Sequence, residues 1–448
     1  MASTFFRDML DQIVERSRAL TTFSLRGEDH GGTIETLSKG LLSGRGESSG
    51  MVVARHILAI FDLLTEDERT DYFRFLAETL VPDADAVRDA AEGFLQDPSQ
   101  EQIRAIAQAV ESPRQEFFRR LNLAPGGTVQ IVRMREALLD RLKDHPELRP
   151  VDDDLVHLFG SWFNRGFLVM HRIDWSTPAA VLEKIIAYEA VHEIDGWDDL
   201  KRRLDPSDRR CYGFFHPSLV DDPLIFVEVA LTEDIPGSIH QLLAEPQTQE
   251  PQKPRTAVFY SISNCQKGLA GISFGNFLIK QVASDLSKEI DSLKTFVTLS
   301  PIPGFMRWLD AARTKGTVDA RALNLLDHAA WPKKKDAAKR LSDTMVPLAA
   351  RYFLQEKRQD GKPLDPVARF HLGNGARLEQ INWLADLSDR GMAQSAGMMV
   401  NYLYDLSDIE KNHEGYAEQG IIAASAAIKR LAPSVQSKPA EDAETEPA

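Results

Sequence analysis

The sequence has few cysteines, no excess of basic residues and no long apolar run, and each shortage excludes a class of protein. The only cysteines among its 448 residues are Cys211 and Cys265, which are too few for a disulfide framework. We therefore expect the protein in a reducing cytosol. The formal net charge of −14 argues against nucleic-acid binding, which needs a basic face. No stretch reaches the roughly 20 consecutive apolar residues of a membrane helix.

Several common sequence signatures are also missing. There is no cysteine cluster and no HExxH, so we expect no metal site, and nothing in the sequence calls for an organic cofactor. The first residues, MASTFFRDML, lack the apolar core of a signal peptide, and the last five, ETEPA, are not a peroxisomal address. We therefore expect a cytoplasmic protein that neither crosses a membrane nor binds nucleic acid.

The first 150 residues have the pattern of a helical bundle. Thr65 and Glu68 form a capping-box pair in front of an apolar run, and Ser99 and Gln102 repeat the arrangement. No β-rich run is evident before about residue 210, apart from short pieces such as 51–53. A helical block with few candidate catalytic residues is typical of a domain that serves in assembly or as a scaffold.

From Cys211 onward the sequence pattern changes and predicts strands that alternate with helices. The segments 223–231, 256–263 and 295–300 are rich in β-branched and aromatic residues and are bounded by proline-containing turns. The tail from Pro433 is short of apolar residues and is predicted to be disordered.

A glycine-containing loop joins the strand at 256–263 to a helix that begins near Phe277. The loop consists of Ala270, Gly271, Ile272, Ser273, Phe274, Gly275 and Asn276. Glycines at a helix start let backbone N–H groups approach a phosphate, and the helix dipole adds attraction. Neither Walker A nor GxGxxG spacing is present, so the loop by itself fits a phosphate site and a plain turn equally well.

The context of this loop resembles the acetyltransferase-like (GNAT) superfamily, in which a glycine loop between a strand and a helix holds the pyrophosphate of coenzyme A. In the matching register Ala270 replaces the usual Gln or Arg, and Ser273 replaces the first glycine. The resemblance implies that the next strand diverges from the previous one and that its end meets the thioester.

Longer segments are similar to the malonyl-CoA decarboxylase family. They are HPSLVDDPLIFVEVALT (216–232), FYSISNCQKGLAGISFGNFLIKQV (259–282), TLSPIPGF (298–305), FHLGNGA (370–376), INWLADLS (381–388) and NYLY (401–404). The resemblance implies an α+β protein with an N-terminal all-α helical bundle, residues 1–158, that mediates oligomerisation, as a homotetramer. A GNAT-like α/β catalytic domain over residues 159–432 and a disordered tail over 433–448 would follow.

The same resemblance implies the reaction and its residues. The substrate is malonyl-CoA, the products are acetyl-CoA and CO2, and the loop from Ala270 to Asn276 binds the coenzyme A part. A Ser–His pair carries over onto Ser300 and His371. Because a histidine with a near-neutral pKa is the usual proton donor, we expect His371 to protonate the α-carbon and Ser300 to bind the malonyl carboxylate or share a proton with His371.

Other interpretations of these residues stay open. Ser300 could be an acyl nucleophile with His371 as its base, and the chain could be a coenzyme A-dependent acyltransferase or a non-catalytic coenzyme A-binding protein. Tyr404, on an expected helix that includes Asn401, could orient His371 or the carboxylate, or simply be a packed aromatic. Glu228 could face the cleft or solvent.

Overall fold

The computed structural model describes residues 30–43, 47–219, 221–244, 253–272, 277–319, 323–328 and 330–432. Chain contacts divide it into two units: the first ends at Trp162 and also includes Gly268–Ile272, and the second comprises Phe163–Lys267 and the residues from Ser273 onward. A helical region thus precedes a unit with a mixed sheet, which confirms the predicted α+β class. The tail predicted for residues 433–448 lies outside the described residues.

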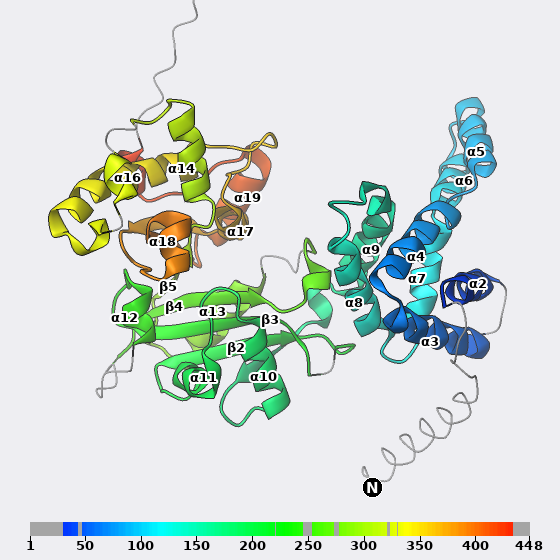
Figure 1. The fold of residues 1–448 in the computed structure, drawn as a ribbon, viewed down its shortest axis with the longest axis horizontal. Coiled ribbons are helices and arrows are strands. Elements are labelled where there is room, and N and C mark those ends of the chain that lie inside the picture. Colours follow the sequence, from blue (N-terminus) through cyan, green and yellow to red (C-terminus); the bar gives the residue numbers. More distant parts are fainter. Residues whose placement is uncertain are drawn as a thin grey trace, which may run out of the picture. The chain divides into compact units, whose positions relative to one another are not determined.

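The described part of the first unit up to Trp162 is helical (Figure 1). Its α-helices are α2 (His30–Leu42), α3 (Glu47–Leu63), α4 (Glu66–Thr79), α5 (Ala84–Gln96), α6 (Gln100–Val110), α7 (Pro113–Asn122), α8 (Gly127–Leu139) and α9 (Arg149–Trp162). The predicted capping box is present, because the Thr65 side chain accepts from Glu68 N and the Glu68 carboxylate accepts from Thr65 N at 2.7 Å.

Two buried ion pairs tie the last helices of this unit together. The Arg114 guanidinium donates to Asp154, and the Arg135 guanidinium donates to Asp152, each at 2.7 Å. Both arginines also donate to backbone carbonyl groups, which satisfies further donors of each guanidinium.

The second unit is built on one eight-stranded sheet of described residues. The strands are β1 (Val169–Ile173), β2 (Arg209–Phe215), β3 (Pro223–Thr232), β4 (Thr256–Asn264), β5 (Thr295–Thr298), β6 (Ser300–Pro301), β7 (Arg377–Asn382) and β8 (Met399–Leu403). They follow the order β1-β2-β3-β4-β5-β8-β6, with β7 also paired to β8. Strand β1 lies well before residue 210, so the expectation of no strand in that region was wrong; it is an edge strand with mostly exposed side chains, which weakens its apolar pattern.

The helices of this unit lie around the sheet, several of them in one group above β5 in the view of Figure 1. They are α10 (Ala179–Tyr188), α11 (Gly196–Leu204), α12 (Ile239–Leu243), α13 (Phe277–Glu289), α14 (Phe305–Thr314), α16 (Lys335–Leu354), α17 (Pro366–Gly373), α18 (Asp389–Ser395), α19 (Ile409–Gln419) and α20 (Ala426–Leu431). Apolar residues of α10 and α11 pack with Cys211 and Phe226 on one side of the sheet. The predicted helix after the glycine loop is α13, and its inward residues, among them Val282 and Leu286, are buried.

The sheet changes character at β5. Strands β1 to β4 pair antiparallel, whereas β4 and β5 pair in parallel. That parallel pairing ends at Phe259 and Thr298, although β4 continues to Asn264. The GNAT resemblance implies that the two parallel strands separate at such a point. On the β5 side, Leu299 is the first residue beyond the pairing, and Ser300 follows it.

Candidate active site

Ser300, His371 and Tyr404 come together in the second unit, although they are far apart in the sequence. His371 Nε2 lies 3.1 Å from Ser300 Oγ, and His371 Nδ1 lies 2.8 Å from the Tyr404 hydroxyl oxygen. The three side chains are buried, with residue exposures of 6% for Ser300, 3% for His371 and 1% for Tyr404. The imidazole therefore has one hydrogen-bond partner on each ring nitrogen.

Local structure explains where the histidine sits. Helix α17 begins after Asp365, whose carboxylate caps it by accepting from Ala368 N at 2.8 Å, and Pro366 occupies the first turn. His371 is in the last turn, and its ring stacks on Tyr402 of β8 with ring centroids 4.5 Å apart. Gly375 has a φ of 81°, and an added Cβ would lie 2.2 Å from the Ile409 carbonyl oxygen, so a glycine is required in this part of FHLGNGA.

Ser300 and Tyr404, the two hydroxyl partners of His371, are positioned by two neighbouring strands. Ser300 belongs to the short strand β6, where it pairs with Val400 of β8. Tyr404 directly follows β8, and its backbone N–H donates to Phe296 O at 2.8 Å. The expectation that Asn401 and Tyr404 lie on a helix was wrong. Asn401 instead belongs to β8, which follows α18 after a left-handed turn at Ala396 and Gly397.

Burial decides the charge state of this site. It lowers the pKa of His371 to about 3, so the imidazole is neutral at pH 7. Burial also raises the pKa of Tyr404, which keeps its phenol proton, and the Asn374 side chain hydrogen-bonds to the phenol oxygen. The expectation of a near-neutral pKa for His371 was therefore wrong, because desolvation favours the uncharged ring and the partner of Nδ1 is a phenol rather than a carboxylate.

Ser300 is surrounded by further polar residues, which the sequence did not identify as site residues. The Ser300 hydroxyl donates to Thr298 Oγ1 at 2.9 Å, and Tyr402 N donates to the same oxygen at 3.2 Å. Asn401 Nδ2 donates to Thr298 O at 2.8 Å, and Asn401 Oδ1 accepts from Asn382 Nδ2 at 2.6 Å. The spacing of Thr298 and Ser300 is the signal that could have found this contact, since residues two apart in an extended segment share a face.

The predicted phosphate loop is described in part. Ala270, Gly271 and Ile272 belong to the segment that clusters with the helical unit, and Ser273, Phe274, Gly275 and Asn276 lie outside the described residues. Arg135 Nη1 donates to Gly268 O at 2.8 Å and to Ala270 O at 2.9 Å. Gly271 follows with a φ of 80°, and an added Cβ there would meet open space.

Comparisons with known proteins show the family of this chain. Family models for the malonyl-CoA decarboxylase N-terminal domain and C-terminal domain match residues 80–163 and 166–444. The chain belongs to the malonyl-CoA decarboxylase family. The mitochondrial malonyl-CoA decarboxylase of Rattus norvegicus is 36% identical over 83% of this chain and 83% of its own length.

Two solved structures of this family are similar over nearly the whole chain. Malonyl-CoA decarboxylase from Rhodopseudomonas palustris is 55% identical, with a TM-score of 0.86, over 89% of this chain and 99% of its own. The enzyme from Agrobacterium vitis is 52% identical, with a TM-score of 0.85, over 90% of this chain and 100% of its own.

Glu228 lies neither in a cleft nor in solvent. It is fully buried on β3, where its Oε2 lies 3.3 Å from Nη1 of Arg203 on α11. Arg203 also pairs with Asp199 at 2.9 Å. Burial raises the pKa of Glu228 to about 8, with Glu189 adding to the increase and Arg203 opposing it, so the side chain holds its proton at neutral pH.

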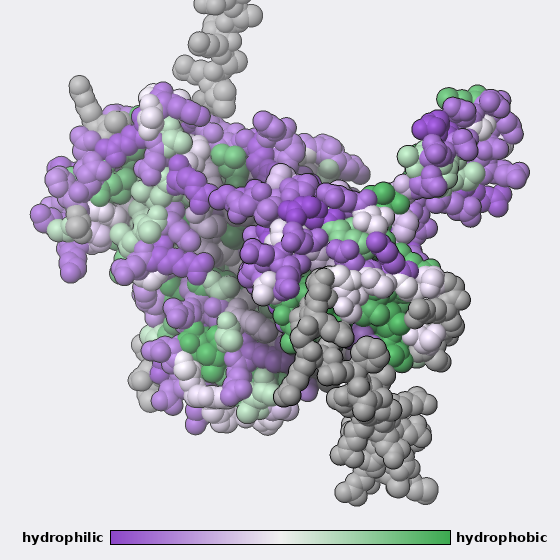
Figure 2. Space-filling view, turned by 45° about the vertical axis from the view of Figure 1, so that its right-hand side comes forward, coloured by the Kyte–Doolittle hydropathy of each residue, from purple (hydrophilic) through white to green (hydrophobic). Residues whose placement is uncertain are grey.

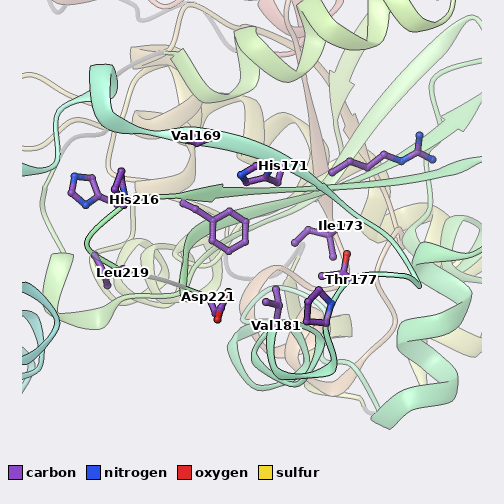
Figure 3. A pocket seen from close by; sticks show the side chains of 12 residues that line it. Val169, His171, Ile173, Thr177, Val181, His216, Leu219 and Asp221 are labelled. Atoms are coloured by element: carbon purple, nitrogen blue, oxygen red, sulfur yellow. The ribbon is translucent and has the colours of Figure 1, made fainter. Parts of the chain in front are cut away.

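A cavity of about 400 Å³ lies elsewhere in the second unit, beside β1 (Figure 3). Val169, His171 and Ile173 contribute one wall, and Thr177 and Val181 contribute another. None of the predicted site residues lines it. Among the described residues there is no group of histidine, cysteine or acidic side chains that could hold a metal ion, and no helix long and apolar enough to cross a membrane.

Proposed function

We infer that this chain catalyses the decarboxylation of malonyl-CoA to acetyl-CoA and CO2, as a carboxy-lyase. Family membership over both domain models supports the reaction, and the observation that carries it to particular atoms is the buried contact between Ser300 and His371. The two motifs that held these residues in the sequence, SPIPGF and FHLGNGA, meet in the fold, which is what a shared catalytic role requires.

The reaction needs a place for negative charge. Loss of CO2 breaks the bond between the carboxyl carbon and the α-carbon, and the electron pair moves into the thioester carbonyl to give an enolate. The α-carbon then takes one proton, which completes acetyl-CoA. Donors aimed at the enolate oxygen lower the barrier, and one such donor in a protein interior contributes about 3 kcal/mol. Side chains of this chain can supply both the donors and the proton.

We propose that Ser300 and His371 act on the malonyl group together. The ring of His371 is neutral without substrate, because burial lowers its pKa to about 3. A malonyl carboxylate bound beside it would raise that pKa, since a nearby negative charge favours the imidazolium. His371 would then be protonated more readily once substrate is present and could give that proton to the α-carbon, and Ser300 would bind the carboxylate or share the proton.

Tyr404 has a supporting role in this proposal. Its hydroxyl lies 2.8 Å from His371 Nδ1, on the side of the ring opposite the serine. A phenol that keeps its proton can donate to Nδ1 and so hold the ring in one orientation. Tyr404 is therefore a positioning residue that acts on the substrate through His371.

We propose that the loop from Ala270 to Asn276 binds the coenzyme A part of the substrate. Two hydrogen bonds from Arg135 fix the carbonyl groups just before Gly271. A fixed backbone with a glycine in the left-handed region is suited to approach a phosphate closely.

We also propose that residues 1–158 form an oligomerisation domain of a cytoplasmic homotetramer and that residues 159–432 form the GNAT-like catalytic domain. The hairpin of α5 and α6 supports assembly through the helices, because no described residue of either helix is buried. Its exposed side chains include Leu95, at 80%, together with Ile103 and Val110, and Figure 2 shows a few apolar residues among the hydrophilic ones of the hairpin. Light scattering of the wild type and of Leu95→Lys would test the assembly: four subunits are expected for the wild type and fewer for the variant.

The activity is tested with purified protein and malonyl-CoA, with acetyl-CoA followed by mass spectrometry. We expect product from the wild type and a loss of about 10²- to 10⁴-fold in kcat for His371→Asn, the range that general acid–base groups contribute. His328→Asn is the matched control, because His328 is exposed and far from the pair in sequence. Wild type without product would refute the reaction, and equal rates for the wild type and His371→Asn would refute the role of His371.

A further inference from the structure

The pairing of β5 and β6 with β8 is interrupted just before the serine. Val297 pairs with Leu403, and Ser300 pairs with Val400, so the two short strands share one register with β8. Between them, side chains replace the backbone ladder. Tyr402 N donates to Thr298 Oγ1, and Asn401 Nδ2 donates to Thr298 O. Thr298 is thus bonded to β8 through both its hydroxyl and its carbonyl.

The fixed hydroxyl of Thr298 determines where the Ser300 proton points. Thr298 Oγ1 accepts from Ser300 Oγ at 2.9 Å as well as from Tyr402 N. A serine hydroxyl has one proton, and here that proton is directed to Thr298. Ser300 Oγ can then take part in its contact with His371 Nε2, at 3.1 Å, only as an acceptor.

The rest of the chain of hydrogen bonds follows from this direction. If Ser300 accepts, Nε2 must carry the proton of the neutral ring, and Nδ1 is then an acceptor. The group beside Nδ1 is the Tyr404 hydroxyl, at 2.8 Å, which can donate, while the Asn374 side chain bonds to its oxygen. Every described partner is therefore consistent with one order, running from Tyr404 through His371 and Ser300 to Thr298.

We propose that Thr298 is a positioning residue that sets this order, so that His371 presents its Nε2 proton and Ser300 is not activated as a nucleophile. In an activated serine the hydroxyl proton is directed to a bare Nε2, which then removes it. Here Thr298 receives that proton instead. The proposal rests on the decarboxylase function proposed above, in which an N–H or O–H donor at the acyl group is needed and an acyl-enzyme is not.

Amide side chains that are hydrogen-bonded in series hold Thr298 in a fixed position. Asn401 is fully buried, and besides its bond to Thr298 O it donates to Pro236 O at 3.3 Å. Its carbonyl oxygen accepts from Asn382, whose own Oδ1 accepts from Gln380 Nε2 at 2.6 Å. Asn382 and Asn401 are both buried, and each is bonded through both its amide nitrogen and its amide oxygen, which holds the threonine in one place.

The test uses full-length protein labelled with ¹⁵N-histidine. The ring nitrogens of His371 are assigned by comparison with His371→Asn, without any substrate. We expect the wild type to carry the proton on Nε2. Thr298→Val removes the hydroxyl acceptor and keeps the branched shape, and it should populate the Nδ1-protonated ring. Thr298→Ser keeps the hydroxyl and should give the wild-type spectrum.

Kinetics supply a second readout. Thr298→Val should lower kcat about 10-fold with little change in KM, and Thr298→Ser should stay within about 3-fold of the wild type. Thr256→Val is the matched control, because Thr256 is also a buried threonine of the sheet but its hydroxyl bonds to Glu233 O. Its kcat should be unchanged.

Two results would overturn the proposal: a wild-type His371 protonated on Nδ1, or a Thr298→Val variant with unchanged kcat and an unchanged ring. The wild-type spectrum decides the first point even if Thr298→Val fails to fold. The protonation state of the ring is measured without substrate and does not depend on whether the wild type turns over malonyl-CoA, so a failure in the spectra is distinct from a failure of the proposed function.

Discussion

His371 and Glu228 are two buried titratable side chains of the same unit, one a base and one an acid, and burial keeps both uncharged at neutral pH. Their surroundings differ. The partners of His371 are the hydroxyl groups of Ser300 and Tyr404. Glu228 instead lies among charged side chains, with Arg203 bonded to both Glu228 and Asp199.

The difference separates a site for chemistry from a site for structure. A neutral chain of hydrogen bonds can hold a proton on a chosen atom and respond when an anionic substrate arrives. A buried arginine among carboxyl groups instead fixes its neighbours, because removing one partner leaves an uncompensated group in the interior. The two sites should therefore respond in opposite ways to substitution and to pH.

The largest effect on stability is expected from Arg203→Met. Arg203 bonds to two carboxyl groups and to the His192 and Glu193 carbonyl oxygens, so its loss leaves several buried acceptors without a donor. We expect the free energy of unfolding to fall by about 3–5 kcal/mol, measured in urea. The remaining folded protein should keep its kcat; a stable variant without activity would contradict the separation.

Acid should destabilise the protein through His371. The folded pKa of about 3 lies below the roughly 6.5 of an unfolded histidine, so in this window the unfolded chain binds the extra proton and stability falls as pH decreases. From pH 7 to pH 5 the contribution is about 2 kcal/mol. His371→Asn should lose less stability over this range than the wild type; equal losses would mean that the ring is not held neutral.

Tyr404→Phe is expected to have an intermediate effect, confined to activity. The variant keeps the ring packing but loses the hydroxyl that lies 2.8 Å from His371 Nδ1. We expect kcat to fall about 10-fold, which is about 1.4 kcal/mol of the barrier, with the free energy of unfolding little changed. A Tyr404→Phe variant as active as the wild type would show that the hydroxyl does not position the ring.

The smallest effect is expected at Glu228, and its pH dependence has the opposite sign. The folded pKa of about 8 lies above that of an unfolded glutamate, so the folded protein holds the proton longer and stability falls as pH rises toward 8 and beyond. Between pH 7 and pH 9 the loss is about 1 kcal/mol. Glu228→Gln should remove this loss and leave kcat unchanged, as measured by urea unfolding at both pH values.

Motifs with local causes were predictable from the sequence. The capping box at Thr65 and the helix after the glycine loop depend on residues a few positions apart, and both are present. The family resemblance named Ser300 and His371, and the fold brings them within hydrogen-bond distance. These predictions needed no knowledge of how the chain is buried.

The features that were missed depend on tertiary structure. NYLY was expected in a helix, but pairing with β7 makes it a strand. The pKa of His371 follows from burial by segments far away in the chain, which no local pattern encodes. The spacing of Thr298 and Ser300 hinted at their contact, but the bonds that fix Thr298 depend on β8, which places Asn401 and Tyr402 against it.

The measurement that tests the central claim most directly is the product of malonyl-CoA turnover in deuterated water. If the Ser300–His371 pair serves decarboxylation, the wild type should yield acetyl-CoA with one solvent deuterium in its methyl group, and no malonate. Free coenzyme A and malonate, with an acyl group trapped on Ser300, would show that the serine is a nucleophile and would contradict the account.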